Sequence, residues 1–191
     1  MYKQIFRNGI SMLAIAFFLI GVSACGSGAK KNDATDNKTA SADVKKYTNK
    51  DGKFAIHFAG EPQVTDKNIP TAVGNIELHM FMYEKSATEV YVVGYSDYPS
   101  ELMKESNRDS VLNGAKNGVV TNVKAAITEE KKIKIEGNDG LFFKANSDQY
   151  YLTYKLFIAG NRLYQIGMMR DGSPVNEDGM KDFFDTFELT K

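Results

Sequence analysis

Apolar and polar residues alternate along several stretches of the chain, which is the pattern of β-strands that bury one face. Phe54, Ile56 and Phe58, for example, fall on one side of an extended segment. In residues 89–98 both sides are apolar or aromatic, which indicates a strand covered on both faces. The predicted extended segments are 54–58, 63–67, 75–85, 89–98, 125–136 (one bent strand or two), 141–145, 150–159 and 162–169.

Two other stretches have apolar residues at helical spacing. In residues 101–119 two glycines weaken the pattern, so we expect a helix centred on residues 107–116. A second helix is predicted near residue 180, with Ser173 as its N-cap and Pro174 in its first position. Its apolar stripe consists of Met180, Phe183, Phe184 and Phe187. We expect this stripe to dock the helix on the sheet.

The connections between extended segments are too short for parallel crossovers, except around residues 101–119. Gly160-Asn161 separates the last two segments and predicts a tight hairpin. Gly-Asn-Asp-Gly at residues 137–140 predicts another turn. We therefore expect an α+β domain with a strongly bent, mostly antiparallel sheet of about six or seven strands and helices packed on it.

The start of the chain follows the pattern of an export signal. Lys3 and Arg7 give a basic start, residues 10–22 carry no charge, and small residues precede Cys25. The alternative is an uncleaved membrane anchor, but this apolar run is shorter than the roughly 20 residues that a spanning helix needs. We therefore expect residues 1–24 to be a signal peptide that is removed on export.

The tetrapeptide Val22-Ser23-Ala24-Cys25 resembles the lipobox of bacterial lipoproteins. The resemblance implies cleavage between Ala24 and Cys25 and acylation of the Cys25 thiol with a diacylglycerol unit. It also implies that fatty acyl chains such as palmitate make the membrane a partner of the protein. Gly26 resembles the outer-membrane sorting pattern of bacteria with two membranes. In a host with one membrane, the protein would lie on the external face of the cell membrane.

Residues 25–46 are predicted to be the lipidated N-terminus and a flexible tether. Residues 26–46 contain no aromatic residue and are rich in Gly, Ser, Asn, Asp, Lys and Thr, so they bury too little apolar surface to fold. Aromatic residues begin at Tyr47, and we place one α+β domain over residues 47–191. Because Cys25 is the only cysteine, this domain has no intrachain disulfide and depends on packing.

The charge of the chain argues against nucleic acid as a partner. The whole sequence has 24 basic and 24 acidic residues, and Lys3 and Arg7 would leave with the signal peptide. A nearly neutral domain without a long run of Lys or Arg does not attract a polyanion by charge alone. We therefore expect no nucleic-acid binding.

Several motifs resemble the PsbP-like domain, named for an extrinsic subunit of photosystem II. They follow the family's order and are found at residues 54–62, 95–99, 137–143, 160–166 and 183–189. The resemblance implies an α/β/α sandwich around an antiparallel sheet. It also implies a role as an assembly factor, extrinsic subunit or binding protein rather than as an enzyme. Photosystem binding is not carried over, because the family's binding segment corresponds here only to the tether.

The residue patterns that accompany catalysis or metal binding are missing from the sequence. The histidines His57 and His79 lie in predicted strands, and neither a His-x-His nor a HExxH spacing occurs. Half-exposed strand histidines are the favoured interpretation, with a metal pair or a general base as the alternative. The carboxylate pairs fit solvated faces, and neither a G-x-S-x-G motif nor a phosphate-binding loop is found. We therefore predict no enzyme, no metal and no cofactor.

Tyrosines are frequent in the predicted strands and offer a contact area with a polar tip. Most are expected to bridge core and solvent. Tyr95, Asp97 and Tyr98 lie where a strand ends before a loop, and we take them as a candidate ligand face.

Together these patterns predict a lipid-anchored, extracytoplasmic protein with a non-enzymatic binding or assembly-accessory domain at the cell envelope. Its partner is expected to be an envelope protein or ligand that the sequence does not identify. One alternative is a lipoprotein that binds a small molecule or a metal at a tyrosine-lined sheet. Another is a hydrolase whose site has no recognised motif.

Overall fold

A computed structural model of the chain describes residues 46–71 and 74–191. The predicted signal peptide, the Ala24–Cys25 boundary and the tether up to residue 45 lie outside the described residues. Among the helices of the described part, none is long and apolar enough to cross a membrane.

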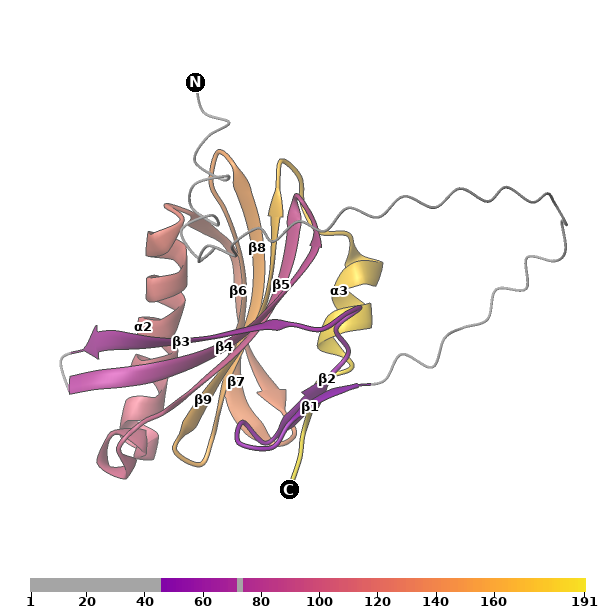
Figure 1. The fold of residues 1–191 in the computed structure, drawn as a ribbon. Coiled ribbons are helices and arrows are strands. Elements are labelled where there is room, and N and C mark those ends of the chain that lie inside the picture. Colours follow the sequence, from indigo (N-terminus) through magenta and orange to yellow (C-terminus); the bar gives the residue numbers. More distant parts are fainter. Residues whose placement is uncertain (1–45, 72–73) are drawn as a thin grey trace, which may run out of the picture. The chain divides into compact units, whose positions relative to one another are not determined.

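Seven strands form the main sheet, and every neighbouring pair is antiparallel. Their order across the sheet is β3-β4-β5-β9-β8-β7-β6 (Figure 1). The strands are β3 (Gln63–Thr71), β4 (Gly74–Ser86), β5 (Glu89–Asp97), β6 (Ala126–Ile135), β7 (Asn138–Asn146), β8 (Tyr150–Ala159) and β9 (Arg162–Asp171). The predicted α+β fold with a mostly antiparallel sheet is confirmed, and residues 126–135 form one strand with a bulge rather than two strands.

A second, three-stranded sheet covers part of the main one. It contains β1 (Tyr47–Asn49), β2 (Phe54–Ile56) and β10 (Glu188–Leu189), with β2 in the middle. The alternation of apolar and polar residues predicted one sheet. Such a pattern identifies strands but does not show which strands pair with each other, so the second sheet was missed. All three residues of β2 are buried, so this short strand lies between the main sheet and the residues packed over it.

One helix packs on each face of the main sheet, as Figure 1 shows. Helix α2 (Glu105–Asn122) contacts β7 and β8, and a 3₁₀ turn at Ser100–Met103 precedes it. Helix α3 (Glu177–Phe184) lies on the other face beside the small sheet. An α/β/α sandwich is therefore too strong a description, because each outer layer has one helix instead of a full helical layer.

Both helices differ from the sequence prediction at their ends. Helix α2 continues through Gly114 and Gly118. A side chain at either position would point into open space, so the two glycines leave no gap in the packing of the helix on the sheet. Helix α3 begins at Glu177 because Asn176, not Ser173, is its N-cap, with its side chain accepting a hydrogen bond from Gly179 N at 2.6 Å.

Residues 173–175 do not join the helix for a physical reason. Arg170 donates from Nη1 to the carbonyl of Pro174 at 3.3 Å, and Val175 is buried in the core. Residues 173–175 are therefore held outside the helix. Pro174 does not occupy the first helical position that the sequence predicted for it.

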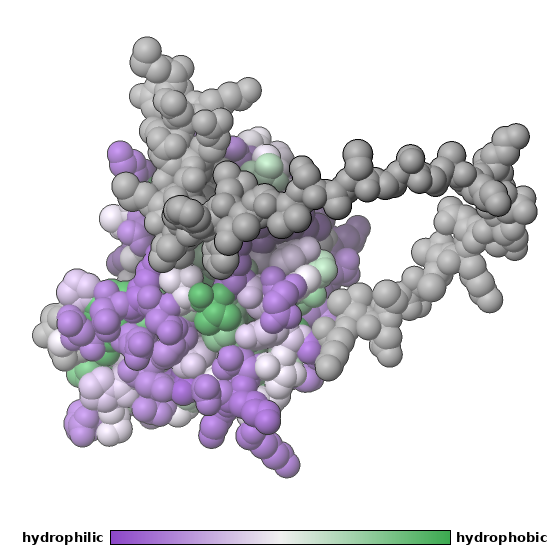
Figure 2. All heavy atoms as spheres, viewed as in Figure 1, coloured by the Kyte–Doolittle hydropathy of each residue, from purple (hydrophilic) through white to green (hydrophobic). Residues whose placement is uncertain are grey.

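Two apolar clusters lie on the two faces of the main sheet. The α2 cluster includes Leu112, Leu141, Phe143, Leu156 and Ile158. The aromatic cluster on the α3 side is dominated by rings, among them Phe54, Phe81, Tyr95, Phe157, Tyr164 and Phe183. The face seen in Figure 2 is mostly hydrophilic, with only small hydrophobic areas. Most of the buried apolar side chains of the described residues belong to one of these two clusters.

The predicted docking of the Phe183 stripe can be tested by truncation. Phe183 is 1% exposed and its ring lies 4.7 Å from that of Tyr91, centroid to centroid. Phe183→Ala should lower the free energy of unfolding by about 3–5 kcal/mol, because it removes a ring from a closed core. Asp182→Ala, a change on the exposed side of the same helix, should stay within about 0.5 kcal/mol. Equal effects in urea unfolding would contradict this packing.

Candidate functional site

The end of β5 and the start of β9 meet at one edge of the aromatic cluster. Asp97 is directly opposite Arg162 in the β5–β9 register. The turn between β8 and β9 is joined to Tyr98, the residue after β5, by two hydrogen bonds: Tyr98 N donates to Asn161 O at 2.9 Å, and Asn161 Nδ2 donates to Tyr98 O at 3.1 Å. Gly160 in this turn has φ +64°, a left-handed conformation that glycine adopts without strain.

Arg162 and Asp97 form a bidentate ion pair at this edge. Arg162 Nε donates to Asp97 Oδ1 at 2.7 Å, and Arg162 Nη2 donates to Asp97 Oδ2 at 2.6 Å. The third nitrogen, Nη1, donates to the carbonyl oxygen of Asp51 at 2.5 Å. All three guanidinium nitrogens therefore have protein acceptors, and the arginine is held in one orientation.

The ion pair changes the acidity of both partners. Hydrogen bonds from Arg162 hold the pKa of Asp97 below its ordinary value of 3.8. The same hydrogen bonds raise the pKa of Arg162 above its ordinary value. Asp97 is consequently ionised near neutral pH and has no proton to give, which makes it unsuited to the role of a general acid.

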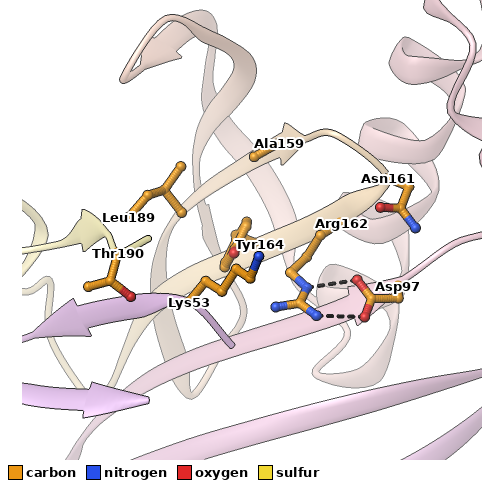
Figure 3. A pocket seen from close by; sticks show the side chains of 8 residues that line it. All are labelled: Lys53, Asp97, Ala159, Asn161, Arg162, Tyr164, Leu189 and Thr190. Carbon is orange, nitrogen blue, oxygen red and sulfur yellow. Dashed lines mark hydrogen bonds and ion pairs between the residues drawn. The ribbon is translucent and has the colours of Figure 1, made fainter. Parts of the chain in front are cut away.

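A cleft of about 350 Å³ opens beside this ion pair, and Figure 3 shows its walls. Residues of β9, of the β1–β2 turn and of the segment around β10 line it, so distant parts of the sequence meet there. Lys53 and Arg162 contribute positive groups and Asp97 a negative one. The volume is at the small end of ligand pockets. Its chemistry fits the binding of a polar or anionic group.

The β1–β2 turn is held against the sheet by close contacts. Tyr164 donates from its hydroxyl to the carbonyl of Gly52 at 2.8 Å. A Cβ at Gly52 would lie 2.7 Å from the ring of Tyr95, so only glycine allows the turn to approach this closely. The turn therefore sets the position of Lys53 at the cleft.

The residues proposed from sequence as a ligand face are not in one place. Tyr95 is 5% exposed and belongs to the aromatic cluster, whereas Tyr98 packs against the α2 cluster on the other side of the sheet. Asp97 has a half-exposed side chain. The structure brings Tyr95 and Asp97 together at Arg162, whose guanidinium carbon is 4.4 Å from the centre of the Tyr95 ring. Sequence reasoning missed Arg162, because the sequence does not indicate that β9 pairs with β5 and places Arg162 opposite Asp97.

A second group of polar side chains lies on the other side of Tyr95. The His79 ring stacks on the Tyr95 ring with centroids 4.6 Å apart. Asp66 and Glu77 surround the same histidine, and one ligand atom from each of the three residues lies within 4.8 Å of the others. Among the described residues this is the one cluster with the composition of a metal site. His57 is not part of it, so the alternative of a histidine pair is not the arrangement found.

Comparison with known proteins gives a fold but no family. No protein-family model matches the chain, and no curated protein sequence matches it. The solution structure of a cyanobacterial PsbP from Synechocystis is similar, with a TM-score of 0.50 and 11% sequence identity, and the match covers 82% of this chain and 98% of that one. A crystal structure from Bacteroides thetaiotaomicron has a TM-score of 0.39 and 9% identity over 78% of this chain and 50% of that one. The first likeness supports a PsbP-like fold.

The Arg162–Asp97 pair makes stability depend on pH. Since the pKa of Asp97 is lowered on folding, its stabilisation is complete above the ordinary value of 3.8 and is lost as the pH falls through the lower folded-state value. Asp97→Asn should reduce the free energy of unfolding at pH 7 by no more than about 1 kcal/mol, because the pair is partly solvated. The reduction should be smaller at pH 2 than at pH 7, because protonation of Asp97 weakens the ion pair.

Urea unfolding of the wild type and of Asp97→Asn at the two pH values measures this difference. The matched control is the same substitution in an Arg162→Met background, where the pH-dependent part should be absent. An equal loss of unfolding free energy at both pH values would show that the stabilisation by Asp97 does not come from the ion pair.

Proposed function

We propose that this protein is an exported lipoprotein, anchored to a bacterial membrane through Cys25, whose PsbP-like domain binds a partner at the cell envelope. The domain acts as an accessory module and does not catalyse a reaction. In this proposal the N-terminal part of the chain determines where the protein is located, and the folded domain provides the binding surface.

The anchor is supported by the sequence before residue 46. The basic start, the short apolar run and Val22-Ser23-Ala24-Cys25 fall in the order of a lipoprotein signal. Two or three acyl chains would hold the protein firmly, since each buried methylene contributes about 0.8 kcal/mol. The polar composition of residues 26–46 suits a tether between lipid and domain.

The observation that carries the binding role is the cleft beside Arg162. It is a concave surface with fixed charges, but its ionisable pair is internally neutralised and Asp97 has no proton to transfer. The likeness to a cyanobacterial PsbP adds support, because the family that the motifs resemble consists of accessory and extrinsic proteins. A small anionic ligand is the second candidate occupant, favoured by the cleft's volume and by Lys53.

Lipidation should depend on Cys25 alone. In a bacterial host, radiolabelled palmitate should enter the wild-type protein but not Cys25→Ser, which should also keep its signal peptide. Ser27→Ala, two residues further on, is the matched control and should be labelled normally. Label that persists in Cys25→Ser, or that is absent from the wild type, would remove the anchor from the proposal.

Partner binding at the cleft can be tested in living cells with a photo-crosslinking amino acid. Placed at Thr190, which lines the cleft and leaves Lys53 in place, it should give a discrete adduct with one envelope component. Placed at Lys181, an exposed lysine of α3, it should give none. Asp97→Lys should weaken the Thr190 adduct, because it breaks the ion pair that shapes the cleft wall. Adducts of equal yield from both positions would contradict a specific binding surface.

A further inference from the structure

Two neighbouring strands bring Asp66, Glu77 and His79 together without the help of a loop. Asp66 on β3 is directly opposite His79 on β4, so their side chains are on the same face of the sheet. Glu77 lies two residues before His79 and therefore also points to that face. The three ligand-bearing side chains are thus positioned by regular backbone pairing, which gives a more precise arrangement than a flexible loop.

Asp66 determines which nitrogen of His79 is available. Its Oδ1 atom lies 2.7 Å from His79 Nδ1, the distance of a charge-assisted hydrogen bond. A carboxylate accepts, so Nδ1 carries the proton and donates. In the neutral ring the lone pair then belongs to Nε2. A carboxylate that orients a histidine through its second nitrogen is the usual arrangement around protein-bound zinc.

The free nitrogen faces a second carboxylate. His79 Nε2 lies 3.8 Å from Glu77 Oε2, too far for a hydrogen bond. Both atoms are acceptors when the imidazole is neutral, so either a proton or a metal cation must lie between them for the contact to be attractive. In tetrahedral zinc sites, ligand atoms about 2.0–2.1 Å from the metal are roughly 3.3 Å apart. A movement of about half an ångström would bring the two atoms to that separation.

The ring of His79 is held in place while the approach to it stays open. It stacks on Tyr95, which is itself in contact with Arg162 on its other side. The side chains of Asp66 and Glu77 are 54% and 57% exposed, so an ion reaches them without opening the fold. A neutral imidazole with two carboxylates also balances the charge of a divalent cation.

We propose that His79 Nε2 and Glu77 bind a zinc ion, with Asp66 as the carboxylate that positions the imidazole. Water completes the coordination, which makes the site open and weaker than a four-ligand structural zinc site. Imidazole and carboxylate together suit zinc, whereas magnesium prefers oxygen ligands only. This site is separate from the cleft beside Arg162, and its existence does not depend on lipidation or on a partner protein.

Zinc binding can be measured on the full chain, purified without a histidine tag in a mild detergent, by competition with a chromophoric zinc indicator. The wild type should bind one equivalent at pH 7.5. His79→Gln and Glu77→Gln should each reduce the affinity at least tenfold. Asp66→Asn should reduce it by about tenfold, the smaller end of the effect of orienting carboxylates.

His57→Gln is the matched control, because His57 is the other histidine of the chain and lies outside the cluster; zinc affinity should be unchanged. Glu77→Gln guards against misfolding as an explanation, since its exposed side chain can be replaced by a nearly isosteric one. Nitrogen NMR of the histidine rings gives a second measurement: zinc should shift the Nε2 resonance of His79, and magnesium should not. No saturable zinc uptake by the wild type, or equal losses in His57→Gln and His79→Gln, would overturn the proposal.

Discussion

The packing of aromatic rings between the main sheet and the layer over it is the interaction on which the rest of this domain depends. With Cys25 as the only cysteine, the chain cannot form an intrachain disulfide, so the burial of apolar rings holds the layers together, assisted by hydrogen bonds such as that from Tyr164 to Gly52. Phe54 of the small sheet lies 5.2 Å from Phe81 of the main sheet and 5.9 Å from Phe187, centroid to centroid. These separations are those of favourable ring pairs. Strands that are too short to be stable alone are thereby fixed on the main sheet.

The same aromatic layer supports the polar groups at its edge. Tyr95 is part of the buried cluster, and its ring also contacts the Arg162 guanidinium and the His79 ring. A ring held by the core thus gives both polar side chains a rigid contact surface. The cleft and the carboxylate–histidine cluster are consequently two sites on one support.

Sequence reasoning recovered the features that depend on local pattern and missed those that depend on pairing. The Gly160-Asn161 hairpin and the Phe183 stripe of α3 were predicted because turn residues and helical spacing are local signals. Arg162 and Asp66 were missed, since each acquires its role only when another strand places Asp97 or His79 opposite it. The separation of β2 from the main sheet likewise depends on which strands accept its hydrogen bonds.

The occupied guanidinium of Arg162 determines how the cleft can recognise a partner. Its nitrogens already donate to Asp97 and to the Asp51 carbonyl, so an incoming anion would have to displace a bidentate carboxylate to gain the same bonds. The arginine is therefore better described as a rigid wall than as a receptor. Lys53 differs from Arg162, because its side chain is exposed and extends along the cleft. Its backbone carbonyl accepts a hydrogen bond from Thr190 N at 2.9 Å, which holds this residue at the cleft. Attraction of an anionic group thus falls to Lys53, and the fixed Arg162–Asp97 pair supplies the shape against which that group must fit.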